Sequence, residues 1–125
     1  RLIEATSGNT GIALAMIARA VGIEMHLVMP DTLTVERTQT MQAFGAQVHL
    51  ISGTMEAARD WAAARVAETA GHSDAFVMLN QFANPDNPQA HYTTTGPEIW
   101  ADTDGEVTHF VAGVGCVIAL FARAA

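Results

Sequence analysis

The sequence predicts an α/β fold in which a parallel sheet lies between helices on both of its faces, a three-layer αβα arrangement. Short apolar segments alternate with longer helical segments along the first 80 residues, and this order favours parallel strands joined by right-handed crossovers. Half of the 125 residues are hydrophobic and 15% are charged, as in a folded domain. The predicted strands cover residues 2–5, 25–29, 47–51 and 76–79, and the predicted helices cover residues 9–21, 35–44 and 55–70.

Residues that disfavour continuation follow most of these elements. Gly22, Gly45 and Gly71 follow the three helices, where glycine readily adopts the left-handed conformation that ends a helix. Pro30 and Gly53 follow the second and third strands, and both residue types interrupt regular pairing. The sequence therefore predicts where the elements stop as well as their type.

Three segments carry more specific expectations. The helix at 9–21 has so few polar positions that we expect it to be buried on most sides. In "QAHYTTTGPEIWADT", Pro97 predicts a kink or a break between two helical pieces. The segment "VTHFVA", residues 107–112, predicts a last strand.

Charge and hydropathy restrict the classes of partner. A net charge of −7 argues against a nucleic-acid-binding surface, which needs clustered Lys and Arg. No apolar stretch reaches the ~20 residues of a membrane-spanning helix, and no secretory signal is visible. We therefore expect a cytoplasmic protein with no nucleic-acid or membrane partner.

Cysteine, histidine and lysine usage restricts the chemistry. Cys116 is the sole cysteine, so the sequence holds neither an internal disulfide nor a CxxC motif. The five histidines have no metal-ligand spacing, and we predict no metal site. All six basic residues are arginines, so no lysine side chain can form a Schiff base.

The segment "TSGNTG", residues 6–11, lies between the first strand and the first helix. Its glycines allow close approach to the backbone, and the opening amides of the helix favour a carboxylate or phosphate. Hydroxyl and amide side chains add donors. The alternative is an ordinary helix cap with turn glycines, and the segment by itself does not decide between the two.

A second loop, "NQFANPDNP", follows the strand at 76–79. Ligands of open parallel sheets bind beyond the carboxyl ends of the strands, so this loop and the "TSGNTG" corner are expected to face a common crevice. Gln81 is the side chain in this loop that we predict to contact a ligand.

Several blocks of the sequence resemble one enzyme family. The blocks "IEATSGNTGIALAMIA", "ERTQTMQAFGAQV", "NQFANPDNPQAHYTTTGPEIW" and "THFVAGVG" resemble, in this order, segments of cysteine synthase, also called O-acetylserine sulfhydrylase. "AHYTTTGPEIW" is most similar to the B-type branch. The resemblance covers residues 2–115 and implies part of a fold type II pyridoxal 5'-phosphate (PLP) enzyme of the tryptophan-synthase-β-like fold.

The resemblance also implies roles for individual residues. Asn9 is expected to bind the 3'-oxygen of the PLP ring, and Gly115 matches the first glycine of the phosphate-binding loop. The bulky residues of "CVIA", 116–119, replace the glycines and threonines that follow in the family. The residues expected to bind the substrate α-carboxylate are Thr6, Ser7, Gly8, Thr10 and Gln81. The family lysine lies upstream of this chain, so no catalytic residue is assigned.

The family implies the following function and organisation. Residues 1–84 correspond to the smaller, substrate-carboxylate-binding domain, and residues 85–125 to an incomplete start of the larger, PLP-binding domain. The family reaction converts O-acetylserine and a sulfur donor, sulfide or thiosulfate, to cysteine and acetate by β-replacement. Full-length relatives are expected to be homodimers. Because the chain has no lysine and an altered phosphate loop, we expect it not to catalyse this reaction by itself.

Two other interpretations stay open at this point. One is a different enzyme of the same fold, such as cystathionine β-synthase or a serine/threonine dehydratase. The other is a non-catalytic binding or interaction module, in which the apolar segment at 117–121 is an exposed adhesive surface.

Overall fold

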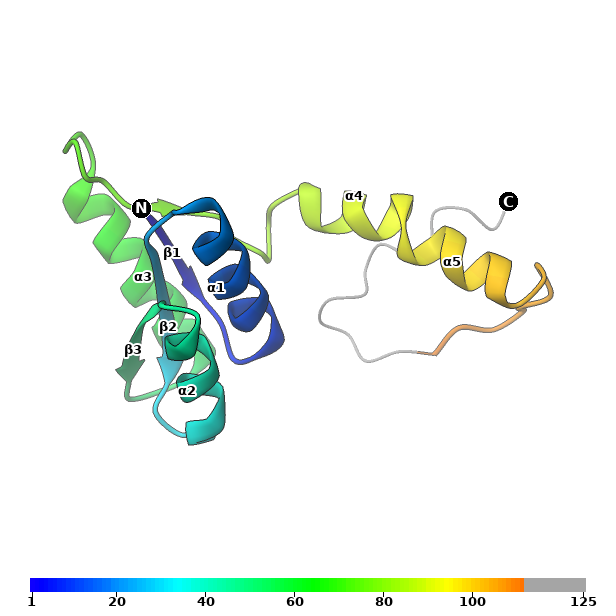
Figure 1. The fold of residues 1–125 in the computed structure, drawn as a ribbon, viewed down its shortest axis with the longest axis horizontal. Coiled ribbons are helices and arrows are strands. Elements are labelled where there is room, and N and C mark those ends of the chain that lie inside the picture. Colours follow the sequence, from blue (N-terminus) through cyan, green and yellow to red (C-terminus); the bar gives the residue numbers. More distant parts are fainter. Residues whose placement is uncertain (112–125) are drawn as a thin grey trace. The chain divides into compact units, whose positions relative to one another are not determined.

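The computed structural model describes residues 1–111, and the predicted α/β fold is confirmed. The chain divides into a first unit, Arg1–Asn80, and a second unit that begins at Gln81. The first unit contains every strand of the described residues (Figure 1). Its elements are β1 (Leu2–Ala5), α1 (Asn9–Val21), β2 (Met25–Pro30), α2 (Val35–Ala43), β3 (Gln47–Ile51), α3 (Met55–Thr69) and β4 (Val77–Met78).

The four strands form one parallel sheet in the order β3-β2-β1-β4. Apolar side chains pack on both faces of the sheet, and β2 is buried at all of its six positions, as expected for an inner strand covered on both sides. On one face, Leu27 and Met29 of β2 pack with Ala15 of α1 and Met41 of α2. On the other face, β1 and Val28 pack against α3. The three layers αβα are thus formed within the first 80 residues.

The ends of the elements agree closely with the sequence. Gly22 is left-handed, with φ 73°, and its N–H donates to Ala18 at the end of α1. Gly45 and Gly71 also have positive φ, as expected for residues that follow a helix. β4 is shorter than the predicted strand at 76–79, because β1 pairs with it at Val77 and Met78 only.

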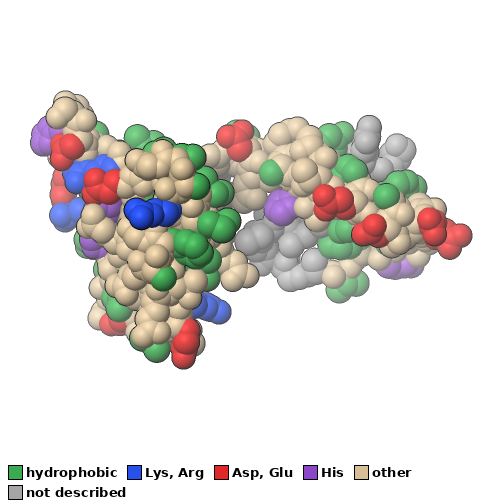
Figure 2. Space-filling view, viewed as in Figure 1, with side chains coloured by type: hydrophobic (Ala, Val, Ile, Leu, Met, Phe, Trp, Pro, Cys, Tyr) green, Lys and Arg blue, Asp and Glu red, His purple; other side chains and the backbone are tan. Residues whose placement is uncertain are grey.

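The expected burial of α1 on most sides is wrong. Ala15 and Ala18 face the sheet, whereas Met16, Ile17 and Val21 are about half exposed, between 49% and 60%. Figure 2 shows hydrophobic side chains grouped over this helix. β2 and α2 contact one stripe of α1, and no other element of the first unit covers its outer side. Hydrophobic composition alone does not report how many neighbours a helix has.

The second unit contains α4 (Asp86–Thr93) and α5 (Thr95–Asp102). The predicted break between two helical pieces is confirmed, and it lies at Thr94. Pro97 is the third residue of α5, where its missing N–H is one that the helix would leave unpaired anyway. The predicted strand at 107–112 is wrong for the described residues, 107–111. A strand needs a partner strand, and the described part of this unit contains helices as its regular elements.

Candidate functional site at the end of β1

The buried hydroxyl group of Thr6 holds the corner between β1 and α1 together by hydrogen bonds. Thr6 is 1% exposed, and its N–H continues the parallel pairing by donating to the carbonyl of Val28. Its Oγ1 accepts the N–H of Gly11 at 3.1 Å and that of Gly8 at 3.3 Å. The strand, the turn and the first helical turn are therefore joined by one side chain.

Gly11 allows α1 to approach this corner closely. A β-carbon at this position would lie 2.5 Å from Cγ2 of Thr6 and 2.8 Å from Cε of Met41. Both distances are far shorter than van der Waals contact. The flexible end of Met41 can shift, but Thr6 is held by its two hydrogen bonds, so a side chain here would displace Thr6 or the first turn of α1. The glycine is required by packing, since its φ is that of an ordinary helix residue.

The alternative interpretation, an ordinary helix cap formed by Ser7 or Asn9 with turn glycines, does not agree with the structure. The N-cap residue is Gly8, and no side chain at that position caps α1. The Thr6 hydroxyl instead binds the third helical amide, that of Gly11. The amides of Asn9 and Thr10, the first two of the helix, have no partner within an α-helix and carry its positive dipole end.

The side chains around these amides are open to solvent. Ser7 and Asn9 are exposed and Thr10 is partly exposed. Among the described residues, none of the three side chains makes a hydrogen bond. The corner thus presents hydroxyl groups, a carboxamide and two amides together at the carboxyl end of β1. An anion with several oxygen atoms fits this donor set.

Arg37 is a residue of this corner that the sequence interpretation missed. It lies on α2, and its Nη1 donates to the carbonyl of Ser7 at 2.5 Å. Its guanidinium is also packed beside Gly8: Nη1 lies 3.5 Å from the position that a β-carbon would take on that glycine. Arg37 therefore braces the corner and adds a positive charge beside it. No local spacing signals this contact, because the packing of α2 against α1 produces it.

Glu4 is a second residue that the sequence interpretation missed. It is fully buried in β1, and its Oε2 accepts the N–H of Asn80 at 2.7 Å. Asn80 has a positive φ of 55°, and Leu79 is the one residue between it and the end of β4. Glu4 thus fixes the start of the loop that leads to Gln81. A carboxylate inside the apolar strand "LIEA" was the available signal, since buried charges require partners.

The predicted site residues fall into three groups. The set from Thr6 to Thr10 is brought together at the corner. Gln81 belongs to the second unit, where its carbonyl accepts from Nδ2 of Asn87 at 2.9 Å. Gly115 lies outside the described residues.

In the part of the chain that the structure describes, no three His, Cys, Asp or Glu side chains gather in a way that would bind a metal ion. None of the helices in this part combines the length and hydropathy needed to cross a membrane.

Comparison with known sequences agrees with the resemblance of the sequence blocks. The chain is 55% identical to cysteine synthase B of Salmonella typhimurium over 116 residues, which cover 91% of this chain and 37% of that protein. It is 48% identical to cysteine synthase A of Escherichia coli K12 over 116 residues, 91% of this chain and 35% of that protein. The B-type relatives are the more similar, as predicted. The chain spans little more than a third of the length of these relatives.

Comparison with solved structures and with family profiles leads to the same group. The cysteine synthase of Entamoeba histolytica superposes with a TM-score of 0.83 at 42% identity, covering 96% of this chain and 36% of that chain. O-ureido-L-serine synthase superposes with a TM-score of 0.80 at 39% identity, covering 95% and 36%. The profile of the family described as pyridoxal-phosphate dependent enzyme matches residues 1–122. The chain therefore belongs to the family of pyridoxal-phosphate dependent enzymes.

Proposed function

We propose that this chain is part of a B-type cysteine synthase. In this proposal the whole protein converts O-acetylserine and a sulfur donor, sulfide or thiosulfate, to cysteine and acetate by β-replacement. The proposal is supported by the identity of 54–55% to three cysteine synthases B. Because the chain spans 37% of those proteins, it supplies one part of the site.

The geometry of the "TSGNTG" corner is the observation that carries the proposal. An α-carboxylate has two oxygens that accept several hydrogen bonds. The amides of Asn9 and Thr10 and the hydroxyls of Ser7 and Thr10 are the donors that we assign to it, with Gly8 allowing close approach and Arg37 adding charge. Thr6 acts by holding this arrangement, since its hydroxyl accepts from Gly8 and Gly11. We assign Gln81 as a further contact to the carboxylate.

The corner also fits one edge of the PLP cofactor. Asn9 is exposed at the first position of α1, and its carboxamide can both donate to and accept from a ring oxygen. We propose that it binds the 3'-oxygen and that Gly115 contributes to phosphate binding. When bound, PLP supplies the electron sink for loss of the β-substituent. The 125 residues contain no lysine for its covalent attachment, so the chain by itself is not expected to turn over substrate.

The organisation of the whole protein is also part of the proposal. Residues 1–84 form the smaller domain, and residues 85–125 begin the larger, PLP-binding domain. We propose a cytoplasmic, homodimeric enzyme without nucleic-acid or membrane partners.

Titration of the ¹⁵N-labelled chain with O-acetyl-L-serine tests the proposal. We expect saturable shifts of the amide signals of Ser7, Gly8, Asn9 and Thr10, because these groups face the carboxylate. O-acetyl-L-serine methyl ester is the matched control, since it lacks the carboxylate charge and should shift the same signals far less. Equal shifts with both ligands, or shifts confined to other parts of the chain, would contradict carboxylate binding at the corner.

A further inference from the structure

His26 and His49 form a hydrogen-bonded pair on the face of the sheet that α3 covers. The pair lies towards the amino ends of the strands, whereas the "TSGNTG" corner lies at their carboxyl ends. His26 lies near the start of β2 and is 6% exposed, and His49 lies in the middle of β3 and is partly buried. Their ring planes are within 13° of each other, with centroids 5.2 Å apart. Phe76 contacts the His26 ring edge-on at 4.7 Å, and Trp61 of α3 contacts the His49 ring at 5.1 Å. Each histidine is thus in contact with one aromatic ring.

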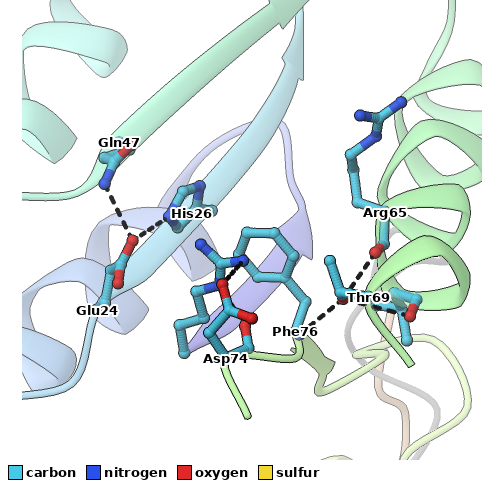
Figure 3. A network of polar contacts seen from close by, with 9 residues as sticks. Glu24, His26, Gln47, Arg65, Thr69, Asp74 and Phe76 are labelled. Carbon is cyan, nitrogen blue, oxygen red and sulfur yellow. Dashed lines mark hydrogen bonds and ion pairs between the residues drawn. The ribbon is translucent and has the colours of Figure 1, made fainter. Parts of the chain in front are cut away.

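Each nitrogen of His26 has a specific partner. Its Nε2 lies 2.7 Å from Oε1 of Glu24, and its Nδ1 lies 2.9 Å from Nε2 of His49. The same Glu24 oxygen accepts from Nε2 of Gln47 at 3.2 Å, and Figure 3 shows Glu24 between His26 and Gln47. Hydrogen bonds therefore link Glu24, the residue before β2, to His26 of β2, and His26 to His49 of β3.

These contacts determine where the protons lie. A carboxylate accepts only, so Nε2 of His26 carries a proton and donates to Glu24. In neutral His26, Nδ1 is then an acceptor, so Nε2 of His49 carries the proton that joins the rings. One additional proton, on either ring, preserves this hydrogen bond. A second additional proton gives each facing nitrogen an N–H, and the bond is lost.

The charges around the pair disfavour that second proton. Arg65 of α3 lies over Trp61 at 5.0 Å, next to His49. The guanidinium of Arg1 lies over Phe76 at 4.0 Å and is paired with Asp74 at 2.9 Å. Glu24 is the carboxylate in direct contact with the pair. Burial, followed by the charges of His26 and Arg65, lowers the pKa of His49.

The position of Phe76 is fixed by α3. Oγ1 of Thr69, near the end of this helix, accepts the N–H of Phe76 at 3.0 Å and donates to the carbonyl of Arg65 at 2.9 Å (Figure 3). The ring that covers His26 is therefore held by the helix that covers His49. Water therefore has little access to His26, which is 6% exposed, and more access to the partly buried His49.

We propose that Glu24, His26 and His49 form a proton-sensitive latch between the edge strand β3 and its neighbour β2. The latch is intact when both rings are neutral or when one of them carries an additional proton. It opens, and the contact between the two strands weakens, when both rings carry an additional proton. β3 has β2 as its sole neighbour in the sheet of the described residues, so loss of the latch acts on one strand pair. The latch is independent of the proposed cysteine synthase activity and lies at the amino end of the strands, away from the corner.

The sign of the pH effect follows from proton uptake. In the unfolded chain His49 titrates near the ordinary histidine pKa of about 6.5, whereas its pKa is lowered in the folded protein. The folded pair binds fewer protons below this pH, so unfolding or opening is accompanied by proton uptake and stability falls as the pH falls. The contribution is complete above about pH 6.5 and is lost as the pH decreases towards the lowered pKa of His49.

Histidine NMR and hydrogen exchange of the 125-residue chain test the latch. At about pH 8, long-range ¹H–¹⁵N spectra should show both neutral rings protonated at Nε2. As the pH falls, protection of β3 amides should decrease by up to about tenfold per pH unit, the limit for one proton taken up on opening, while α1 amides change less.

The variant His49→Gln separates charge from hydrogen bonding. Its amide nitrogen can donate to Nδ1 of His26 but does not titrate, so the acid-dependent loss of β3 protection should disappear. His72→Gln is the matched control, because His72 is exposed and should leave the pH dependence as in the unaltered chain. Independent titration of both rings near pH 6.5, or β3 protection that does not change with pH, would overturn the proposal. If His49→Gln does not fold, the tautomers of the unaltered chain decide: a neutral His26 protonated at Nδ1 would overturn it equally.

Discussion

The two ends of the sheet use their polar groups in opposite ways. At the carboxyl end of β1, Thr6 satisfies the inner amides of the corner, and the donors of Ser7, Asn9 and Thr10 point to solvent. At the amino end of β2, the nitrogens of His26 bind partners within the protein. Donors that face solvent can form additional hydrogen bonds to an anion that binds from outside. Two nitrogens that are already paired with each other within the protein instead lose their hydrogen bond when both carry a proton. The first arrangement indicates ligand binding, and the second indicates pH-dependent stability.

The substitution Gly11→Ala should have the largest effect on the corner. The new methyl group would lie 2.5 Å from Cγ2 of Thr6 and 2.8 Å from the flexible Cε of Met41, so Thr6 or the first turn of α1 must move. Overpacking of this kind costs about 1–3 kcal/mol, and we expect a cost in the upper part of this range. The higher helix propensity of alanine offsets about 1 kcal/mol or less of that cost. Urea unfolding followed by circular dichroism gives the change in the free energy of unfolding.

A second substitution checks the cause of this loss. Thr6→Ser keeps the hydroxyl group and removes the methyl group that the new β-carbon would meet. The double variant Gly11→Ala with Thr6→Ser should therefore lose less stability than the sum of the two single variants. Additive losses would show that the Thr6 methyl group is not the obstacle.

The substitution Thr6→Val should have the next largest effect. It preserves the shape of the side chain but removes the acceptor for the N–H groups of Gly8 and Gly11. An unsatisfied buried donor costs about 1–3 kcal/mol; because Gly8 is partly exposed and its N–H can bind water, we expect the lower end, about 1 kcal/mol, in urea unfolding. In Thr6→Ser the acceptor stays, so the amide signals of Gly8 and Gly11 should keep their positions. Similar displacement of these signals in both variants would contradict the role of the hydroxyl group.

The sequence predicted the fold well because its signals are local. Apolar strands, helical segments and glycines such as Gly22 determine each element within a few neighbouring residues, and the alternation of elements implies a parallel sheet. The strand expected at 107–112 is absent from the described residues 107–111, because pairing also needs a partner strand. The outer side of α1 was misjudged for the same reason, since burial depends on what the rest of the structure provides.

The sites were predicted less completely, because their contacts join distant positions. The corner was visible as one continuous motif, but Arg37 reaches Ser7 across 30 positions through helix packing. His26 and His49 were interpreted as scattered histidines. The parallel register places His26 opposite Gln47 and Val28 opposite His49, which brings the two rings to the same face. No spacing rule within the sequence gives that register.

The substitution Arg37→Met should have a moderate effect on binding and a small effect on folding. Arg37 is exposed and water can replace it at the carbonyl of Ser7, so its removal should change the free energy of unfolding by about 1 kcal/mol or less. Loss of its charge beside the corner should weaken binding of O-acetyl-L-serine by about fivefold, since a charge pair near the surface contributes roughly 1 kcal/mol. Arg59→Met, an exposed arginine on α3, is the matched control and should leave the affinity unchanged. Equal affinities of the Arg37 and Arg59 variants would remove Arg37 from the site.

The smallest effect is expected for Glu24→Gln, and its pH dependence sharpens the contrast between the two ends. The hydrogen bond from His26 is the main cause that lowers the pKa of Glu24 below its ordinary value of 4.5. A carboxylate with a lowered pKa contributes stability that is present above that value and is lost as the pH falls through the folded-state pKa. The unaltered chain should therefore be slightly more stable than Glu24→Gln near neutral pH, and the two should converge in acid. Because the glutamine oxygen still accepts from Nε2 of His26, the neutral tautomer of His26 should be the same in both chains. Urea midpoints measured from neutral to acidic pH give the comparison, and a difference that persists in acid would assign the effect of Glu24 to packing instead of charge.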